Sequence, residues 1–258
     1  LGGAQSVAST DGAITLTMAG ADALLGSTDL QTGYDLVDGA PGFLATPNMA
    51  TLTGADSITV EDVTVDEAMG LVNLQNMSGV DNLDFSIADS ESLLNLSVTQ
   101  ATAAVEATNV AAGDVSVKDS AGMIVYGAAG TDPIDLAAVQ QVTVMTSTDA
   151  DEDLTTYPAL ATIADVIELN GSVTLTVDQA GLTLTGAGSY SVSDTADAIE
   201  AEVTDTSAGV LDGATTISSP DVLTLTVEEY KALDDEDTAL PPYPMASYRI
   251  NDSADAIE

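Results

Sequence analysis

One eleven-residue phrase occurs twice in this chain, and its relatives recur along much of the sequence. The two copies are YSVSDTADAIE at Tyr190–Glu200 and YRINDSADAIE at Tyr248–Glu258, 58 residues apart (248 − 190). FSIADSESLL from Phe85 and VSVKDSAGMI from Val115 share its pattern of alternating apolar residues before an Asp-Ser or Asp-Thr pair. With shorter β-branched runs these segments give a quasi-period of about 27 residues, a length typical of stacked repeats. Repeats this short cannot bury an apolar face alone, so the chain must fold by packing successive repeats together.

The periodicity of each copy changes at its Asp. Before it, Tyr190 and Val192 alternate with polar residues, as in a half-buried strand. After it, Ala196 and Ile199 lie on one face of a helix, and Asp194 is a suitable N-cap. Each repeat is therefore predicted to be a strand, a cap and a short helix. The same pattern predicts further helices over residues 66–74, 133–141 and 227–240.

A second kind of repeat carries an additional strand. SVTLTVDQAGLTL at 172–184 and VLTLTVEEYKAL at 222–233 align with an offset of 50 residues (223 − 173), and GAITLTMAGADALL near the start is a looser relative. The two kinds alternate near the C-terminus. The paired unit is therefore predicted to span about 50 to 58 residues.

Helical crossovers between strands predict parallel pairing, because a tight hairpin cannot make that connection. The predicted fold is mainly β with short helices, an elongated parallel β/α solenoid of rungs of about 27 residues. Tandem immunoglobulin-like β-sandwich modules are the alternative, since they also suit a Thr-, Val-, Gly- and Asp-rich chain.

The domain prediction has two parts. Residues 1–56 form an atypical N-terminal rung with a long Gly- and Pro-rich insertion, and residues 57–258 form the repeat solenoid. Within the solenoid, 57–165 are divergent rungs, 166–258 are well-matched repeats, and the last rung is incomplete. We expect its apolar end to be continued by further residues or by the first rung of a neighbouring subunit.

The composition excludes several partners and chemistries. Forty-two acidic residues against three basic ones give a net charge of −39, which argues against binding nucleic acid or an anionic membrane surface. The chain has no Cys and no His, so it lacks thiolate zinc ligands and the usual general base. No long uncharged apolar run occurs, so no membrane insertion is predicted. An acidic chain of this kind suits an extracellular or bacterial cell-surface location.

Two acidic loops are candidate calcium sites. TDADEDL places Asp149, Asp151 and Asp153 at the 1-3-5 spacing that opens an EF-hand loop, but Leu154 stands where that loop needs Gly. DDED supplies Asp234, Asp235 and Asp237 without that spacing. No cofactor is required, and calcium is the one metal these loops predict. A solvated acidic turn is the alternative for both.

The Asp residues that end the core strands pose a related question. They are Asp62, Asp89, Asp119, Asp194 and Asp252. Stacked at one corner, two such carboxylates would repel by roughly 0.9 kcal/mol in water and about 3.5 kcal/mol at an effective dielectric of 20. Capping of helices is the favoured interpretation, and neutralising cations are the alternative.

Catalysis is not predicted. Carboxylates are the only abundant catalytic groups, so a two-acid glycosidase is the one enzyme to consider. The chain has no Trp, and its aromatic residues make up 3%, which is poor material for a sugar-binding platform.

Over residues 166–258, the two long phrases and LTLTVEEYKAL between them resemble tandem repeats of very large bacterial surface and secreted proteins, including type I-secreted, RTX-like adhesins and surface-layer repeat regions. The resemblance implies an extracellular, structural or adhesive segment of a longer chain. The calcium nonapeptide G-G-x-G-x-D-x-U-x of RTX proteins is absent, so calcium binding by their parallel β-roll is not implied.

These observations predict a non-enzymatic extracellular structural protein, a segment of a bacterial surface layer, sheath, filament or giant adhesin. It would self-associate by stacking of repeats, or continue in a longer chain. A calcium-dependent adhesin of β-sandwich modules is the alternative, and a carbohydrate-active enzyme is the third hypothesis.

Overall fold

The structure is a computed structural model, and it describes most of the chain in two compact units. The described residues are 6–7, 14–25, 29–30, 33–45, 48–78, 80, 83–127, 134–149, 151–204, 209–211, 213–233 and 248–252. Unit 1 comprises residues 1–117 and 130–140, and unit 2 comprises residues 118–129 and 141–258. The predicted domain division at residue 56 stays a prediction.

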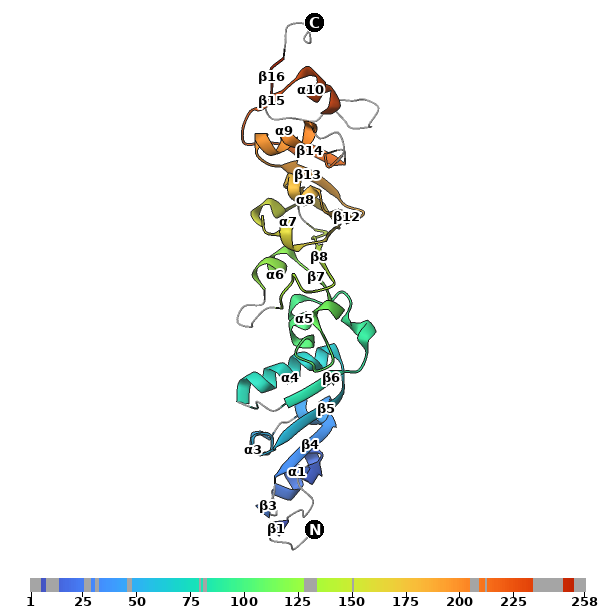
Figure 1. The fold of residues 1–258 in the computed structure, drawn as a ribbon, viewed down its shortest axis with the longest axis vertical. Helices are drawn as coiled ribbons and strands as arrows, with labels where there is room; N and C mark the ends of the chain where they lie inside the picture. Colours follow the sequence, from blue (N-terminus) through green and yellow to red (C-terminus); the bar gives the residue numbers. More distant parts are fainter. Residues whose placement is uncertain are drawn as a thin grey trace. The chain divides into compact units, whose positions relative to one another are not determined.

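Unit 1 contains a parallel four-stranded sheet in which the strands follow one another in sequence order (Figure 1). Its strands are β2 (Ile14–Leu16), β4 (Tyr34–Gly39), β5 (Ser57–Val63) and β6 (Leu83–Ile87). Two shorter strands, β1 (Ser6–Val7) and β3 (Asp29–Leu30), also pair in parallel. Each strand therefore receives the next repeat on its open edge.

The helices of unit 1 connect these strands and contact one another in series, α1 with α2 and α3, α2 with α4, and α4 with α5. They are α1 (Met18–Leu25), α2 (Ala40–Leu44), α3 (Met49–Thr53), α4 (Val65–Ser78) and α5 (Val98–Ala104), with 3-10 turns η1 (Ser90–Leu93) and η2 (Ala112–Asp114). Strand β7 (Ser116–Asp119) spans the division between the units in the sequence.

Unit 2 has parallel strands in two main sheets. One contains β8 (Gln141–Met145), β10 (Val166–Leu169) and β12 (Thr183–Gly186), and the other contains β9 (Glu152–Asp153), β11 (Ser172–Leu175), β13 (Ser189–Ser193) and β14 (Ala214–Ser218). Only Asn170-Gly171 and Ala187-Gly188 separate β10 from β11 and β12 from β13. The chain thus turns a sharp corner from one sheet to the other. A further parallel pair joins β15 (Leu223–Leu225) to β16 (Tyr248–Ile250).

Short helices of unit 2 also contact one another in series, from α6 to α10. They are α6 (Ala121–Tyr126), α7 (Leu160–Ile163), α8 (Val177–Ala180), α9 (Ala196–Thr204) and α10 (Val227–Leu233), with the 3-10 turn η3 (Leu154–Thr156). As predicted, helices lie within 66–74, after Asp194 and from residue 227.

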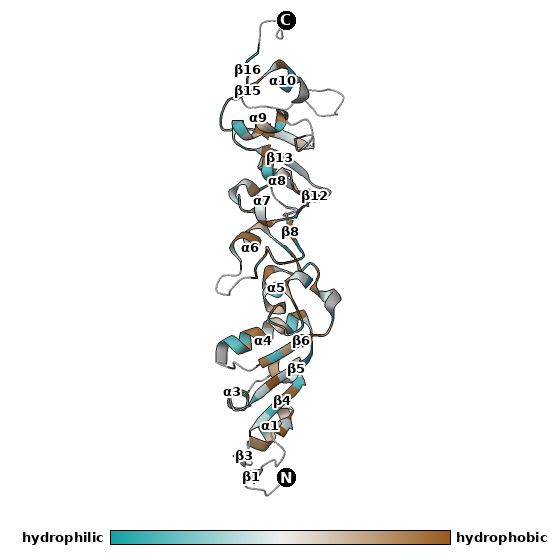
Figure 2. Cartoon of the chain, in the orientation of Figure 1, coloured by the Kyte–Doolittle hydropathy of each residue, from teal (hydrophilic) through white to brown (hydrophobic). Residues whose placement is uncertain are grey.

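The core of each unit is built from aliphatic residues at alternate strand positions. In β6, Leu83, Phe85 and Ile87 are buried while Asp84 is exposed. Hydrophobic positions alternate with polar ones along the strands (Figure 2). Burying one side chain of this size stabilises the fold by about 1.5–3 kcal/mol.

The described pairings confirm a mixed α/β fold of parallel sheets and short helices. Every strand pairing among the described residues is parallel. The antiparallel sheets of immunoglobulin-like sandwiches are therefore wrong for this chain.

Two local predictions are also wrong. Residues 136–140 form turns instead of the helix predicted over 133–141, because Asp135 closes a turn at Ala137 and Ala138 and Gln140 then bonds back to Val115. Asp62 does not end its strand: it lies inside β5, exposed and at φ 54°, where a bulge interrupts the pairing with β6.

Candidate functional site

Two kinds of strand alternate along the chain, and each ends in a different helix cap. We call a strand Thr-type where it ends at Thr17, Thr64, Ser97, Thr176 or Thr226, and Asp-type where it ends at Asp38, Asp89, Asp119, Asp194 or Asp252. In all five cases the Thr-type strand pairs in parallel with the Asp-type strand that follows it: β2 with β4, β5 with β6, Leu96 with Val117, β11 with β13, and β15 with β16.

The Asp of an Asp-type strand links two consecutive helices. One carboxylate oxygen of Asp194 accepts from the N–H of Val177, in the helix before it, at 2.9 Å, and the other accepts from Thr195 at 2.7 Å. Asp38 bonds Met18 and Gly39 in the same way, at 3.1 and 2.9 Å. Asp252 repeats the first contact, to Val227 at 3.0 Å. These carboxylates therefore cap helix N-termini, where negative charge is favourable.

Thr-type strands end in capping boxes, in which cap and third helical residue bond each other's backbone N–H. The pairs are Thr64 with Glu67, Ser97 with Gln100, Thr176 with Gln179, and Thr226 with Glu229. Gln179 is fully buried, and its amide also donates to the carbonyls of Leu154 and Tyr157 at 2.9 and 3.0 Å. It thereby joins α8 to the preceding repeat.

A tyrosine begins three of the Asp-type strands: YDLVD at 34–38, YSVSD at 190–194 and YRIND at 248–252. The hydroxyl of Tyr34 donates to the carbonyl of Thr51 at 2.6 Å, and that of Tyr190 donates to Val210 at 3.0 Å. Each hydroxyl thus fixes the loop that leads into the next strand, β5 or β14.

The two loops that receive these hydroxyls share one sequence pattern. TLTGADSI at 51–58 and VLDGATTI at 210–217 match in Leu, Gly, Ala and the terminal Ile. A Cβ on Gly54 would stand 2.8 Å from the Tyr34 hydroxyl, and one on Gly213 would stand 2.7 Å from that of Tyr190. The tyrosine side chain therefore requires glycine at this position. We call this pattern, Leu-x-Gly-Ala-x-Ser/Thr-Ile/Val, the tyrosine-binding segment.

Burial raises the pKa of Tyr34, and the charges of Asp22 and then Asp56 raise it further. The ring is 4% exposed. Tyr248, in the third copy, is 44% exposed and stacks on Tyr230 with ring centroids 5.2 Å apart.

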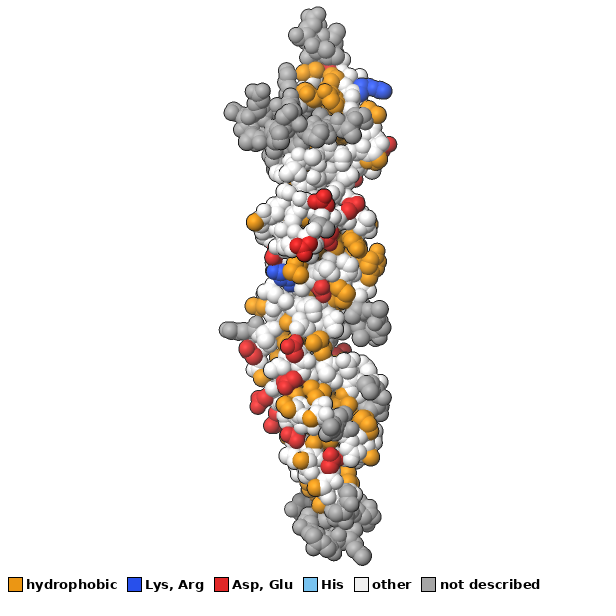
Figure 3. All heavy atoms as spheres, turned by 180° about the vertical axis from the view of Figure 1, so that it is seen from behind, with side chains coloured by type: hydrophobic (Ala, Val, Ile, Leu, Met, Phe, Trp, Pro, Cys, Tyr) orange, Lys and Arg blue, Asp and Glu red, His pale blue; other side chains and the backbone are white. Residues whose placement is uncertain are grey.

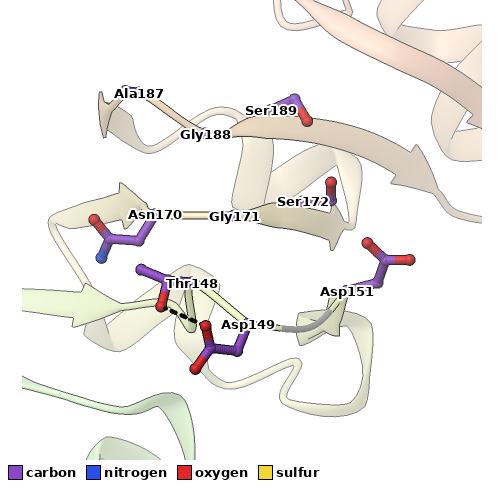
Figure 4. Close-up of a pocket in the computed structure, with 9 residues that line it drawn as sticks. All are labelled: Thr148, Asp149, Asp151, Asn170, Gly171, Ser172, Ala187, Gly188 and Ser189. Atoms are coloured by element: carbon purple, nitrogen blue, oxygen red, sulfur yellow. Dashed lines mark hydrogen bonds between the residues drawn. The ribbon is translucent and has the colours of Figure 1, made fainter.

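The first acidic loop lines an open cavity of about 610 Å³ at the corner between the two sheets of unit 2. Figure 4 shows its lining residues, which are Thr148, Asp149, Asp151, Asn170, Gly171, Ser172, Ala187, Gly188 and Ser189. Asp149 bonds the Thr148 hydroxyl at 3.3 Å. The cavity wall is otherwise the backbone of stacked corners.

The predicted calcium ligands have different positions. Asp149 and Asp151 line this cavity, whereas Asp153 caps η3 by accepting from Thr155 N–H at 3.1 Å and from its hydroxyl at 2.6 Å. Among the residues that the structure describes, no three acidic side chains are grouped as a metal site. Asp234, Asp235 and Asp237 lie outside the described residues. Calcium binding therefore stays a prediction.

Acidic side chains recur over the surface of both units (Figure 3). Lys118, in β7, forms a salt bridge with Glu168 in β10. At half-exposed positions such a pair contributes about 0–1 kcal/mol, so local neutralisation is small against the net charge of −39.

The sequence analysis missed the first tyrosine strand and the tyrosine-binding segments. The signal was present, because YDLVD matches YSVSD at its Tyr, aliphatic and Asp positions. Pro41 and Pro47 in the following loop favoured interpretation of this region as an insertion.

Comparison with models of protein families, with curated proteins and with solved structures finds no match. The resemblance to bacterial surface repeats therefore stays a prediction. Within the part of the chain that the structure describes, no helix combines the length and apolar character needed to cross a bilayer.

Proposed function

We propose that this chain is a non-enzymatic extracellular structural protein, a segment of a bacterial surface layer, sheath, filament or giant adhesin that assembles by stacking of repeats. The observation that carries the proposal is the fivefold pairing of a Thr-type strand with the Asp-type strand that follows it. An open edge in a parallel sheet can accept a further strand, so the same contact can extend from one repeat to the next.

Within this proposal the stacked repeats form an elongated β/α solenoid. Carboxylates such as Asp194 and buried amides such as Gln179 support it, because each bonds the backbone of an adjacent repeat. A compact domain of this length has a radius of gyration of about 18 Å. We expect small-angle X-ray scattering of the monomer to give a clearly larger value, and a value near 18 Å would contradict the solenoid.

The net charge of −39 gives assembly a salt dependence. Raising NaCl from about 0.15 to 1 M shortens the Debye length from about 8 to 3 Å, which screens repulsion between subunits. We expect electron microscopy and sedimentation velocity to detect linear assemblies that grow with protein and salt concentration. A chain that stays monomeric at every concentration and salt level would overturn the proposal.

A second candidate function is calcium-dependent adhesion, favoured by the position of Asp149 and Asp151 on one cavity. Calcium bound there would stabilise the folded chain through mass action. A melting midpoint that rises in millimolar calcium, in the parent chain but less in Asp149→Asn/Asp151→Asn, would support this function. The exposed Asp221→Asn is the matched control, and equal midpoints in calcium and EDTA would exclude the function.

A further inference from the structure

The tyrosine-binding segment occurs three times in the sequence, but it follows only two of the three tyrosine strands. Tyr34 and Tyr190 are each followed by a copy, at 52–58 and 211–217. The third copy is LGGAQSV at 1–7, with Leu, Gly, Ala, Ser and Val at the matching positions. Tyr248 has no such segment after it in the printed sequence.

The surroundings of the third tyrosine match this difference. Tyr34 is 4% exposed under its segment, whereas Tyr248 is 44% exposed. Strand β16 pairs with β15 on one edge. In β4, the corresponding strand, one edge pairs with β2 and the other pairs with β5, which begins within the tyrosine-binding segment.

Strand β1 has the complementary feature. Ser6 and Val7 match Ser57 and Ile58 of β5. Strand β5 lies between β4 and β6, whereas β1 pairs with β3 on one side. The position equivalent to β4 is therefore open in the pairing of β1.

We propose that residues 1–7 of one copy of this chain bind the tyrosine strand at 248–252 of a second copy, so that β1 extends the β15–β16 pair in parallel. The β4–β5 register, with Ser57 opposite Asp35 and Ile58 opposite Leu36, places Ser6 opposite Arg249 and Val7 opposite Ile250. Gly3 then lies against the Tyr248 ring, as Gly54 lies against Tyr34. The inference rests on the proposed end-to-end assembly and identifies its interface.

Charge favours this contact in an otherwise strongly acidic chain. Residues 1–10 contain no acidic residue. Arg249 replaces Asp35 of the first tyrosine strand, and Gln5 replaces Asp56 of the first binding segment. Two acidic groups of the contact within the chain are thus a base and an amide in the contact between copies, which lowers repulsion where two acidic subunits meet.

Disulfide trapping tests the contact, because the chain has no native Cys. A Ser6→Cys protein and an Arg249→Cys protein, distinguished by tags and mixed at high salt, should form an interchain disulfide on oxidation. The matched control is Asn251→Cys, on the same face but two residues out of register. That displacement puts the Cα atoms about 8 Å apart, beyond the reach of a disulfide.

Two further variants test the packing. Gly3→Val and Tyr248→Ala should each weaken assembly by about tenfold or more while leaving the melting curve unchanged. Tyr126→Ala is the control, since Tyr126 is 73% exposed and outside the contact. If the parent chain assembles but neither the disulfide nor the Gly3→Val defect is observed, this interface is wrong and end-to-end assembly uses another. If the parent chain remains monomeric, both proposals fail.

Discussion

The carboxylate of Asp194 accepts a hydrogen bond from the backbone N–H of Val177, 2.9 Å away and 17 residues earlier in the chain. The donor belongs to the first turn of α8, and the acceptor ends the strand that pairs with β11, the strand leading into that helix. One side chain thus connects the cap of its own helix to the start of the previous one. The contact explains why Asp is repeated at the end of these strands.

Asp194→Ala should lower the free energy of unfolding by about 1–3 kcal/mol, because two helix N–H groups lose their acceptor. Asp194→Asn keeps one acceptor oxygen and should cost less. Urea denaturation followed by circular dichroism measures both. Asp221→Ala is the exposed control, and an Asp194→Ala chain no less stable than this control would show that the link contributes nothing.

Tyr34 should ionise at a higher pH than the exposed tyrosines, since burial and the carboxylates of Asp22 and Asp56 raise its pKa. A raised pKa in the folded state means that this stabilisation is complete below the unfolded value, about 10, and is lost as pH rises through the folded value. Absorbance at 295 nm should lose its last step in Tyr34→Phe. Loss of an earlier step, as expected for Tyr126→Phe, would contradict the assignment.

Gly188→Ala should destabilise unit 2 by about 1–3 kcal/mol, since a side chain at this corner forces neighbouring backbone to move. Its Cβ would lie 2.3 Å from the carbonyl oxygen of Gly171. Gly122→Ala is the control, because its Cβ would meet the Tyr157 hydroxyl at an ordinary 3.6 Å and helices favour Ala. Thermal melts that move equally for both variants would contradict the requirement for glycine.

Local patterns predicted the repeating unit well. Alternation at Tyr190 and Val192 and helical spacing at Ala196 and Ile199 are properties of adjacent residues, and the strand and helix lie where those patterns place them. The parallel direction followed from the helical crossovers. Such features are visible in sequence because they depend on neighbours within one repeat.

Contacts between repeats could not be predicted in the same way. Nothing adjacent to Asp194 indicates that its second oxygen reaches Val177, and nothing near Gln179 indicates that its amide bonds Leu154. The acidic loop failed for a similar reason: the 1-3-5 spacing ignores Thr155, whose N–H turns Asp153 towards η3. These partners depend on the offset between stacked repeats, which varies along the chain.

Gln179 offers the sharpest test of the links between repeats. It is fully buried, and its amide nitrogen donates to the carbonyls of Leu154 and Tyr157. Gln179→Leu should cost about 1–3 kcal/mol for each carbonyl left without a donor. Gln179→Glu keeps the shape and the capping box, but it directs a carboxylate oxygen at both carbonyls.

Burial and these carbonyl dipoles favour the protonated form of the new Glu, so its pKa in the folded state should lie above the unfolded value of about 4.3. The difference in stability between Gln179→Glu and the parent chain should therefore be smallest below pH 4.3 and grow by up to about 1.4 kcal/mol per pH unit above it. Urea titrations of both chains across this range measure the difference. Glu229→Gln, at the equivalent half-buried cap, should show no growth with pH. A pH-independent difference for Gln179→Glu would mean that residue 179 is accessible to water, and that α8 is not held against the preceding repeat by this side chain.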